Sequence, residues 1–195
     1  MPTLRKSCLL LLFVLLSVPA EAADRTCTLK PVPAAFVDRV NDYAAVQRMI
    51  ITSLGPPLVW SEAEQVLRQQ RRFANAMREV RPMLGNGGFF TPDVSKYFRE
   101  RIDAIVQEAG LDVTTAIEAP DEDDIIVAAP PRAAEPVPWN AGPVMWPSVL
   151  RALPELPPEL EYRFLGRHLL IIDGLANLVV DVLYDALPEP EFSSS

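Results

Sequence analysis

The sequence holds a single histidine, His168, and only two cysteines, Cys8 and Cys27. A metal site that needs two or more histidines is therefore excluded. The chain also lacks the glycine-rich motifs of phosphate-binding loops and the Gly-x-Ser-x-Gly motif of a nucleophile elbow. Carboxylates are plentiful, but no spacing singles out an acid–base pair. We predict neither a cofactor nor a metal ion, and no residue is identified as catalytic.

Long apolar runs are absent except near the N-terminus, where an apolar segment covers residues 8–18. It follows a short basic region and precedes Ala20 and Ala22, small residues of the kind that a signal peptidase requires. The segment is too short to cross about 30 Å of hydrocarbon, which takes about 20 residues. We therefore predict that residues 1–22 are a cleavable signal peptide. The protein would act in the periplasm or outside the cell, with no membrane anchor left after cleavage.

The remaining single cysteine and single histidine have ordinary interpretations. Cys27 is the only cysteine after residue 22, so no intramolecular disulfide can form in the exported chain. It is either a small side chain in an N-terminal arm or a thiol that allows an intermolecular disulfide. His168 stands beside Arg167 at the start of a predicted strand, which favours a surface or half-buried side chain over a base or a metal ligand.

Positive charge is scarce overall, and the formal net charge is −8 at pH 7. Phosphate backbones and anionic lipid headgroups repel such a protein, so we predict no nucleic-acid partner. The exception is the stretch from Arg68 to Arg81, which holds five arginines. These arginines could bind an anionic ligand or an acidic partner. The alternatives are a solvated helix face or docking of the chain's own acidic segment.

Helical patterns fill the first half of the chain. Apolar residues recur there at the spacing of one helix face. Ser61 and Glu64 form a capping box for the second helix. Thr91 and Pro92 suit the start of the third helix, and Gly110 suits its end. The short connection between the first two helices predicts a helical hairpin. We predict helices over residues 33–54, 61–81 and 91–109.

Residues 112–158 differ in composition, with ten prolines and the acidic run at residues 121–124. Proline removes backbone donors and favours extended chain, so we predict an acidic, proline-rich arm that runs over the outside of the core. The arm contains Trp139 and Trp146. These aromatic side chains either dock onto the domain or contact a partner protein.

The C-terminal part favours β-structure. Residues 162–184 are rich in β-branched and aromatic side chains and contain two turn signals, which predicts an antiparallel hairpin or meander. For residues 175–187 a strand is favoured, although a helix also fits the spacing. The predicted fold class is α+β. The predicted organisation is a signal peptide (1–22), a helical part (23–111), the arm (112–158), a β part that shares one core with the helices (159–187) and a disordered tail (188–195).

Three stretches resemble an uncharacterised family of exported bacterial proteins. They are VNDYAAVQR (40–48), GGFFTPDVSKYFRERI (87–102) and LPELPPELEYRFLGRHLLIIDGLANLVVDVLYDALP (153–188). The resemblance implies the same architecture and export, and it implies no activity. Two positions depart from the family pattern, because Gln47 stands where the family has histidine and Gly88 where it has aspartate. A site built on those two residues in relatives would be absent here.

Two classes of function follow. The first is a non-catalytic envelope or secreted protein that binds a partner, predicted to be another envelope protein, or acts as an accessory. The second is a hydrolase or small-ligand-binding protein without a recognisable motif. A pocket lined by several of the charged candidates would favour the second class, and scattered candidates around a filled core would favour the first. The candidate polar contact residues are Arg48, Arg99, Arg163, Arg167, Asp173 and Asp181.

Overall fold

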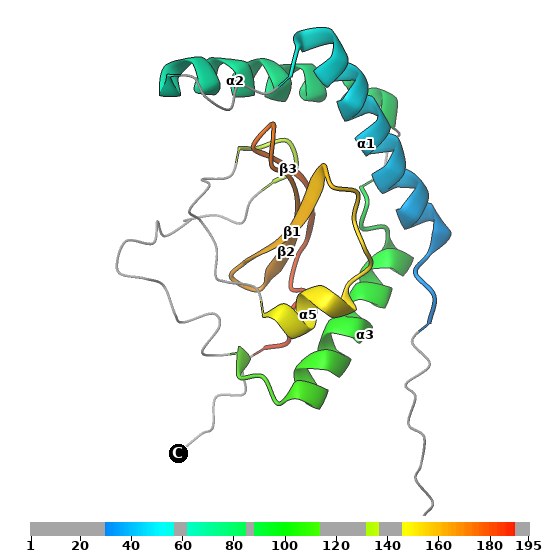
Figure 1. The fold of residues 1–195 in the computed structure, drawn as a ribbon. Helices are drawn as coiled ribbons and strands as arrows, with labels where there is room; N and C mark the ends of the chain where they lie inside the picture. The colour runs from blue at the N-terminus through cyan, green and yellow to red at the C-terminus, as the bar shows by residue number, and fades with distance from the viewer. Residues whose placement is uncertain (1–29, 57–61, 85–87, 114–131, 137–145, 190–195) are drawn as a thin grey trace, which may run out of the picture.

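The computed structural model describes residues 30–56, 62–84, 88–113, 132–136 and 146–189. These residues form an α+β fold, as the sequence predicted (Figure 1). The helical elements are α1 (Ala34–Leu54), α2 (Ala63–Val80), the 3-10 turn η1 (Arg81–Leu84), α3 (Pro92–Ala109) and α5 (Pro147–Ala152). The strands are β1 (Leu160–Leu165), β2 (His168–Asp173) and β3 (Leu178–Leu183).

The helix ends follow local chemistry most clearly in α3. The Thr91 side chain accepts a hydrogen bond from the Val94 N–H at 3.5 Å, and Gly110 ends the helix with φ 58°. The predicted capping box of α2 is wrong in its cap residue. Glu62 occupies the N-cap position and its side chain makes no capping hydrogen bond. Ser61 lies outside the described residues.

The strands form an antiparallel meander in the order β1-β2-β3. Gly166 turns the chain between β1 and β2 with φ 55°, a left-handed conformation that glycine adopts without a Cβ penalty. Asn177, with φ 50°, serves the turn before β3. The strand interpretation of the last element is confirmed, because residues 178–183 pair with β2.

A β-bulge interrupts the β2–β3 pairing. Ile171 pairs with Asp181 and Ile172 pairs with Val179, so Val180 is an extra residue in β3. The Val180 carbonyl accepts a hydrogen bond from Arg81 Nη1 at 2.7 Å. In an unbroken strand Val180 and Val182 would lie on one face. The bulge shifts the alternation by one residue, so the two valines join different apolar clusters.

The larger apolar cluster joins the helices to one face of the sheet. Phe36 of α1 and Phe98 of α3 meet with their ring centroids 5.0 Å apart, and both are almost fully buried. Figure 1 shows α1 and α3 along one side of the sheet, with α2 across one end. Isolated helices of this length are marginal in water, so this shared burial is what stabilises them. Other members of the cluster are Phe73, Phe164, Ile171 and Val180.

The opposite face of the sheet is also buried. It carries a second, smaller cluster of Leu170, Ile172, Val179 and Val182. The helices and strands share the larger cluster, and the opposite face of the sheet adds this smaller one. Apolar side chains alternate between both faces of β2, as in a sheet covered on two sides.

The arm is not an external, extended segment throughout. Residues 147–152 form helix α5, and Val149 and Leu153 are buried in the larger cluster together with Val113. Trp146 packs against the same cluster, so it docks onto the domain. Residues 132–136 pair with the edge of β3, where Ala134 N–H donates to the Val179 carbonyl at 2.7 Å. Trp139, the acidic run and the end of the predicted tail lie outside the described residues.

Candidate functional site

A buried carboxyl group lies at the end of β2. The Asp173 side chain is 0% exposed. Its Oδ2 atom accepts a hydrogen bond from Tyr43 Oη at 3.0 Å, and its Oδ1 atom accepts one from Ala176 N–H at 2.8 Å. Burial raises the pKa of Asp173, while the hydrogen bonds lower it. Asp173 therefore ties α1 to the turn before β3.

The hydroxyl of Tyr43 is held as a neutral donor. Burial raises its pKa, and the neighbouring charge of Asp173 raises it further. Arg81 opposes this shift only in part. Tyr43 therefore stays protonated and donates to the carboxylate, as a structural hydrogen bond requires.

Gln47 follows Tyr43 by one helical turn of α1 and is 2% exposed. Its amide favours the ionised form of Asp173. Within the part of the chain that the structure describes, Nε2 makes no hydrogen bond of ordinary distance and angle, so the amide stabilises the Asp173 carboxylate from a poorly aligned position.

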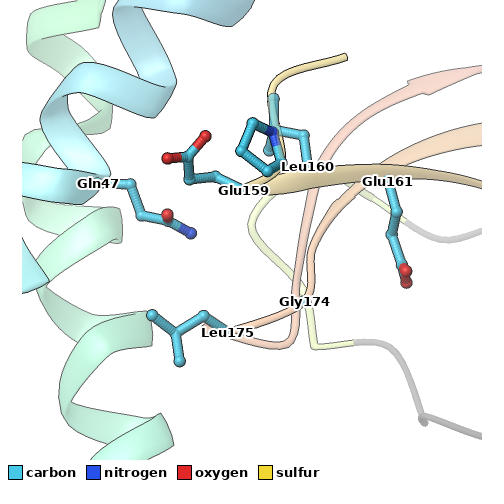
Figure 2. A pocket seen from close by; sticks show the side chains of 7 residues that line it. Gln47, Glu159, Leu160, Glu161, Gly174 and Leu175 are labelled. Atoms are coloured by element: carbon cyan, nitrogen blue, oxygen red, sulfur yellow. The ribbon is translucent and has the colours of Figure 1, made fainter. Parts of the chain in front are cut away.

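A pocket of about 270 Å³ opens beside Gln47. It is lined by Gln47, residues 158–161 and the turn residues Gly174 and Leu175. Figure 2 shows the Gln47 side chain reaching from α1 into the space between Glu159 and Leu175. Helix α1, the start of β1 and the β2–β3 turn thus meet around one cavity.

An ion pair closes one side of this pocket. Arg48 Nε donates to Glu159 Oε1 at 2.5 Å, and Arg48 Nη2 donates to Glu159 Oε2 at 3.2 Å. The Glu159 side chain is only 13% exposed, and the hydrogen bond from Arg48 lowers its pKa. Arg48 is thus occupied by a bidentate contact that anchors the segment before β1 to α1.

Asp181 holds the segment that precedes α3. Its Oδ2 atom accepts a hydrogen bond from Phe90 N–H at 2.9 Å. Gly88 lies so close that a Cβ there would stand 2.5 Å from the same oxygen. An aspartate at position 88, which the resemblance leads one to expect, therefore does not fit beside Asp181 in this arrangement.

The remaining charged candidates contact the main chain or acidic side chains that are not among the six candidates. Arg99 donates to the Tyr184 carbonyl at 2.8 Å and to the Asp185 carbonyl at 3.2 Å. Arg167 Nη2 donates to the Leu187 carbonyl at 3.1 Å. These two arginines fix the chain that follows β3. Arg163 pairs with Glu161 at 2.6 Å on the surface of β1.

The charged candidates therefore do not converge on one pocket. Arg48 and Asp173 lie near the cavity, but none of the six candidates is among its lining residues. No pattern in the sequence identified Glu159 and Gly174 as pocket residues. The one signal available was Gln47, an amide in the apolar stripe of the first helix.

The contacts of His168 are those of a residue that stabilises the fold. Its Nδ1 atom accepts a hydrogen bond from Asp185 N–H at 3.0 Å, and its ring meets the edge of Tyr184. Partial burial lowers its pKa, which favours the neutral acceptor form. The described ranges contain no group of three or more histidine, cysteine, aspartate and glutamate side chains placed to hold a metal ion.

The first half of α2 is exposed. Its residues become buried only from Phe73 onward. Leu67 is 51% exposed, and Arg71 and Arg72 beside it are also exposed. Figure 1 shows this helix extending away from α1. The exposed half presents an apolar side chain among arginines.

Comparison of the chain with protein-family models, curated proteins and solved structures finds no match. Among the described residues, no helix has both the length and the apolar character that crossing a membrane requires.

Proposed function

We propose that this protein is an exported, non-catalytic binding or accessory protein of the cell envelope. One observation carries the proposal. The arginines and carboxylates that could have formed a reactive site are used as structural contacts, such as Arg99 with two main-chain carbonyls and Asp181 with a main-chain N–H. A hydrolase of this composition would need such groups around a common substrate position.

The contact surface that fits this role is the first half of α2. Helix α2 holds four arginines against two glutamates, in a chain whose net charge is −8. Exposed Leu67 stands among these arginines. An apolar anchor surrounded by guanidinium groups suits an acidic partner protein, since arginine binds carboxylates in a bidentate manner.

The proposal is tested by photo-crosslinking in cells. A photoreactive residue at position 67 should form an adduct with a partner through an acidic segment of that partner. The same residue in place of Met49, which is 68% exposed on α1, is the matched control and should form no such adduct. Reversing two exposed charges with Arg71→Glu and Arg72→Glu should abolish the adduct. An adduct that forms equally at both positions, or survives charge reversal, would contradict the proposed surface.

Export is part of the same proposal. The basic, apolar and small-residue segments within residues 1–22, together with the resemblance to exported bacterial proteins, support it. Cleavage is expected between Ala22 and Ala23. The intact mass of protein recovered from the periplasm or the medium measures this directly. A mass that still includes residues 1–22 would refute the expected cleavage.

His168 and Cys27 are expected to be dispensable for partner binding. His168 accepts a main-chain hydrogen bond away from α2, and Cys27 has no partner cysteine in the exported chain. The variants His168→Ala, Cys27→Ala and their combination should form the position-67 adduct at the wild-type level. Loss of the adduct at normal protein abundance would show that one of these side chains takes part.

A further inference from the structure

The two edges of the sheet differ in what lies beside them. At the β3 edge, residues 132–136 are hydrogen bonded to the strand, because Ala134 N–H donates to the Val179 carbonyl at 2.7 Å and Val179 N–H donates to the Glu135 carbonyl at 2.9 Å. Strand β1 forms the other edge, and within the described residues only β2 pairs with it. In that part of the chain, β1 is therefore the edge that can accept a further strand.

The main-chain groups of β1 point alternately towards β2 and towards the open edge. Leu160 N–H belongs to the second set, because it donates to the Pro157 carbonyl at 2.9 Å and not to β2. Tyr162 and Phe164 follow at intervals of two residues, so their N–H and C=O groups also face the open edge. Across the described ranges, no main-chain hydrogen bond joins these two residues to a segment other than β2. Tyr162 thus presents a main-chain donor and an acceptor to an incoming strand.

The side chains of β1 restrict which strand can pair there. Leu160 and Phe164 belong to the larger cluster, so Glu161 and Arg163 lie on the opposite face of the strand. Arg163 Nη2 donates to Glu161 Oε1 at 2.6 Å, and both side chains are partly exposed. Charged residues on an edge strand oppose pairing with most other strands. Opposite charges two residues apart, however, complement the same sequence running in the opposite direction.

Pairing of β1 with a second copy of itself fits one register. An antiparallel pair centred on Tyr162 places Glu161 opposite Arg163 of the second copy, and the reverse. Centring the pair on Glu161 or on Arg163 would set like charges directly opposite each other, which is unfavourable. The register centred on Tyr162 also allows the main-chain groups of this residue to exchange two hydrogen bonds with those of the second copy. Charge and main-chain pairing therefore select the same register.

The contact between Glu161 and Arg163 within one strand is compatible with this pairing. A carboxylate has about four acceptor positions and a guanidinium group about five donors, so each can keep its partner and add one across the axis. The four side chains then alternate in sign, and such a network stabilises more than isolated surface pairs do. It carries no net charge, so it adds no repulsion to a chain whose formal net charge is −8.

We propose that the protein forms a symmetric dimer in which β1 of each copy pairs with β1 of the other. The two three-stranded sheets become one continuous sheet. The interface is isologous, so each copy contributes the same residues and the assembly closes at two chains. It shares no residue with the exposed first half of α2, so this inference is independent of the proposed function.

Sedimentation equilibrium of the purified protein, from about 1 μM to about 1 mM, measures the self-association. The mass of the wild-type protein should rise from that of a monomer to that of a dimer and no further. Glu161→Arg and Arg163→Glu each set like charges opposite each other and should weaken the dimer at least about tenfold. Arg72→Glu, the matched charge reversal on exposed α2, should leave it unchanged.

Two results of this measurement would overturn the proposal. Wild-type protein that stays monomeric throughout would leave the open edge to a strand of another protein. Association that both β1 variants retain at the wild-type level would place the contact elsewhere on the molecule.

An equimolar mixture of the two β1 variants separates lost charge complementarity from lost folding. In a mixed dimer, the two arginines of the Glu161→Arg protein face the two glutamates of the Arg163→Glu protein. The mixture should therefore associate at least about tenfold more tightly than either variant alone. Circular dichroism verifies that both variants are folded. Failure of the folded variants to associate when mixed overturns the register centred on Tyr162.

Amide hydrogen exchange of the wild-type protein locates the interface. Exchange at Tyr162 N–H should slow about tenfold once about nine-tenths of the chains are dimeric, because this donor then has an acceptor in the second copy. Leu160 N–H already donates to Pro157 and should exchange at a rate that does not depend on concentration. Unchanged exchange at Tyr162 in a sample that dimerises would overturn the proposal.

Discussion

Replacing Asp173 by alanine is expected to lower the free energy of unfolding by about 3 kcal/mol. The carboxylate is fully buried and accepts hydrogen bonds from Tyr43 Oη and Ala176 N–H. Alanine leaves both donors without an acceptor and opens a small cavity between α1 and the sheet. Urea unfolding followed by circular dichroism at neutral pH measures the loss.

Asp173→Asn is the matched control. Asparagine has nearly the same volume, its Oδ1 atom can accept from Ala176 N–H, and its Nδ2 atom can donate to Tyr43 Oη. It also removes the cost of burying a charge. The free energy of unfolding should therefore change by less than about 1 kcal/mol. Equal losses for the alanine and asparagine variants would contradict this account, because they would show that the ionised carboxylate itself is required.

Comparison of the wild-type protein with Asp173→Asn also reports the direction of the Asp173 pKa shift. Burial raises the pKa of this carboxyl in the folded protein, whereas in the unfolded chain it keeps a value of about 3.9. Between the two values the folded protein holds more protons than the unfolded protein. The part of the stability that arises from this pKa difference is therefore fully present below the unfolded pKa and is lost as pH rises through the folded pKa, whereas the hydrogen bonds of Asp173 remain.

The measurement is the difference in unfolding free energy between wild type and Asp173→Asn across the acidic range. Wild type should lose stability relative to the variant as pH rises above about 4, and the difference should level off once Asp173 is ionised in the folded protein. Comparing the two proteins removes the contribution of the other carboxylates. A difference that grows in favour of wild type as pH rises would show that the hydrogen bonds outweigh burial.

The long helices could be predicted from sequence because their signals are local. Thr91, Pro92 and Gly110 each act on the backbone within a turn of their own position, and α3 begins and ends where they predict. The start of α2 was less well defined. Ser61 and Glu64 have the spacing of a capping box, but the cap position falls at Glu62.

Features that depend on contacts between segments distant in sequence could not be predicted. The bulge at Val180 arises from the match between β2 and β3, and Val180 in isolation looks like any residue of an alternating strand. Helix α5 starts at Pro147 within a proline-rich stretch whose composition favours extended chain. It is stabilised by burying Val149 in the larger cluster, a contact that local composition does not reveal.

In the candidate site, too, the contacts between distant residues could not be predicted from local sequence. Tyr43 and Asp173 are 130 residues apart in sequence, and Arg48 and Glu159 are 111 residues apart. The sequence identifies polar side chains but not what they contact. Main-chain carbonyls, which accept hydrogen bonds from Arg99 and Arg167, carry no residue-specific signal at all. This is why the sequence could suggest Arg99 and Arg167 as contact residues but could not show that they bind main-chain carbonyls.

Gly88→Ala is expected to lower the free energy of unfolding by about 2 kcal/mol. The new Cβ would stand 2.5 Å from Asp181 Oδ2, so the carboxylate must move. That movement breaks its hydrogen bond with Phe90 N–H, which holds the chain before α3. Gly88 has no positive φ, so the expected loss comes from the contact with Asp181 and not from backbone strain. Thermal or urea unfolding of the variant measures it.

A double-mutant cycle with Asp181→Ala isolates this contact. Asp181→Ala alone should cost about 1 kcal/mol, the value of the lost hydrogen bond to Phe90 N–H. With Asp181 removed, the added methyl group at position 88 no longer meets an oxygen, and Gly88→Ala should cost almost nothing further. The two substitutions should therefore be non-additive by about 2 kcal/mol. Strictly additive losses would mean that Gly88 is required for a reason other than its distance from Asp181, and the close approach of these two residues would then not explain why this chain has glycine at that position.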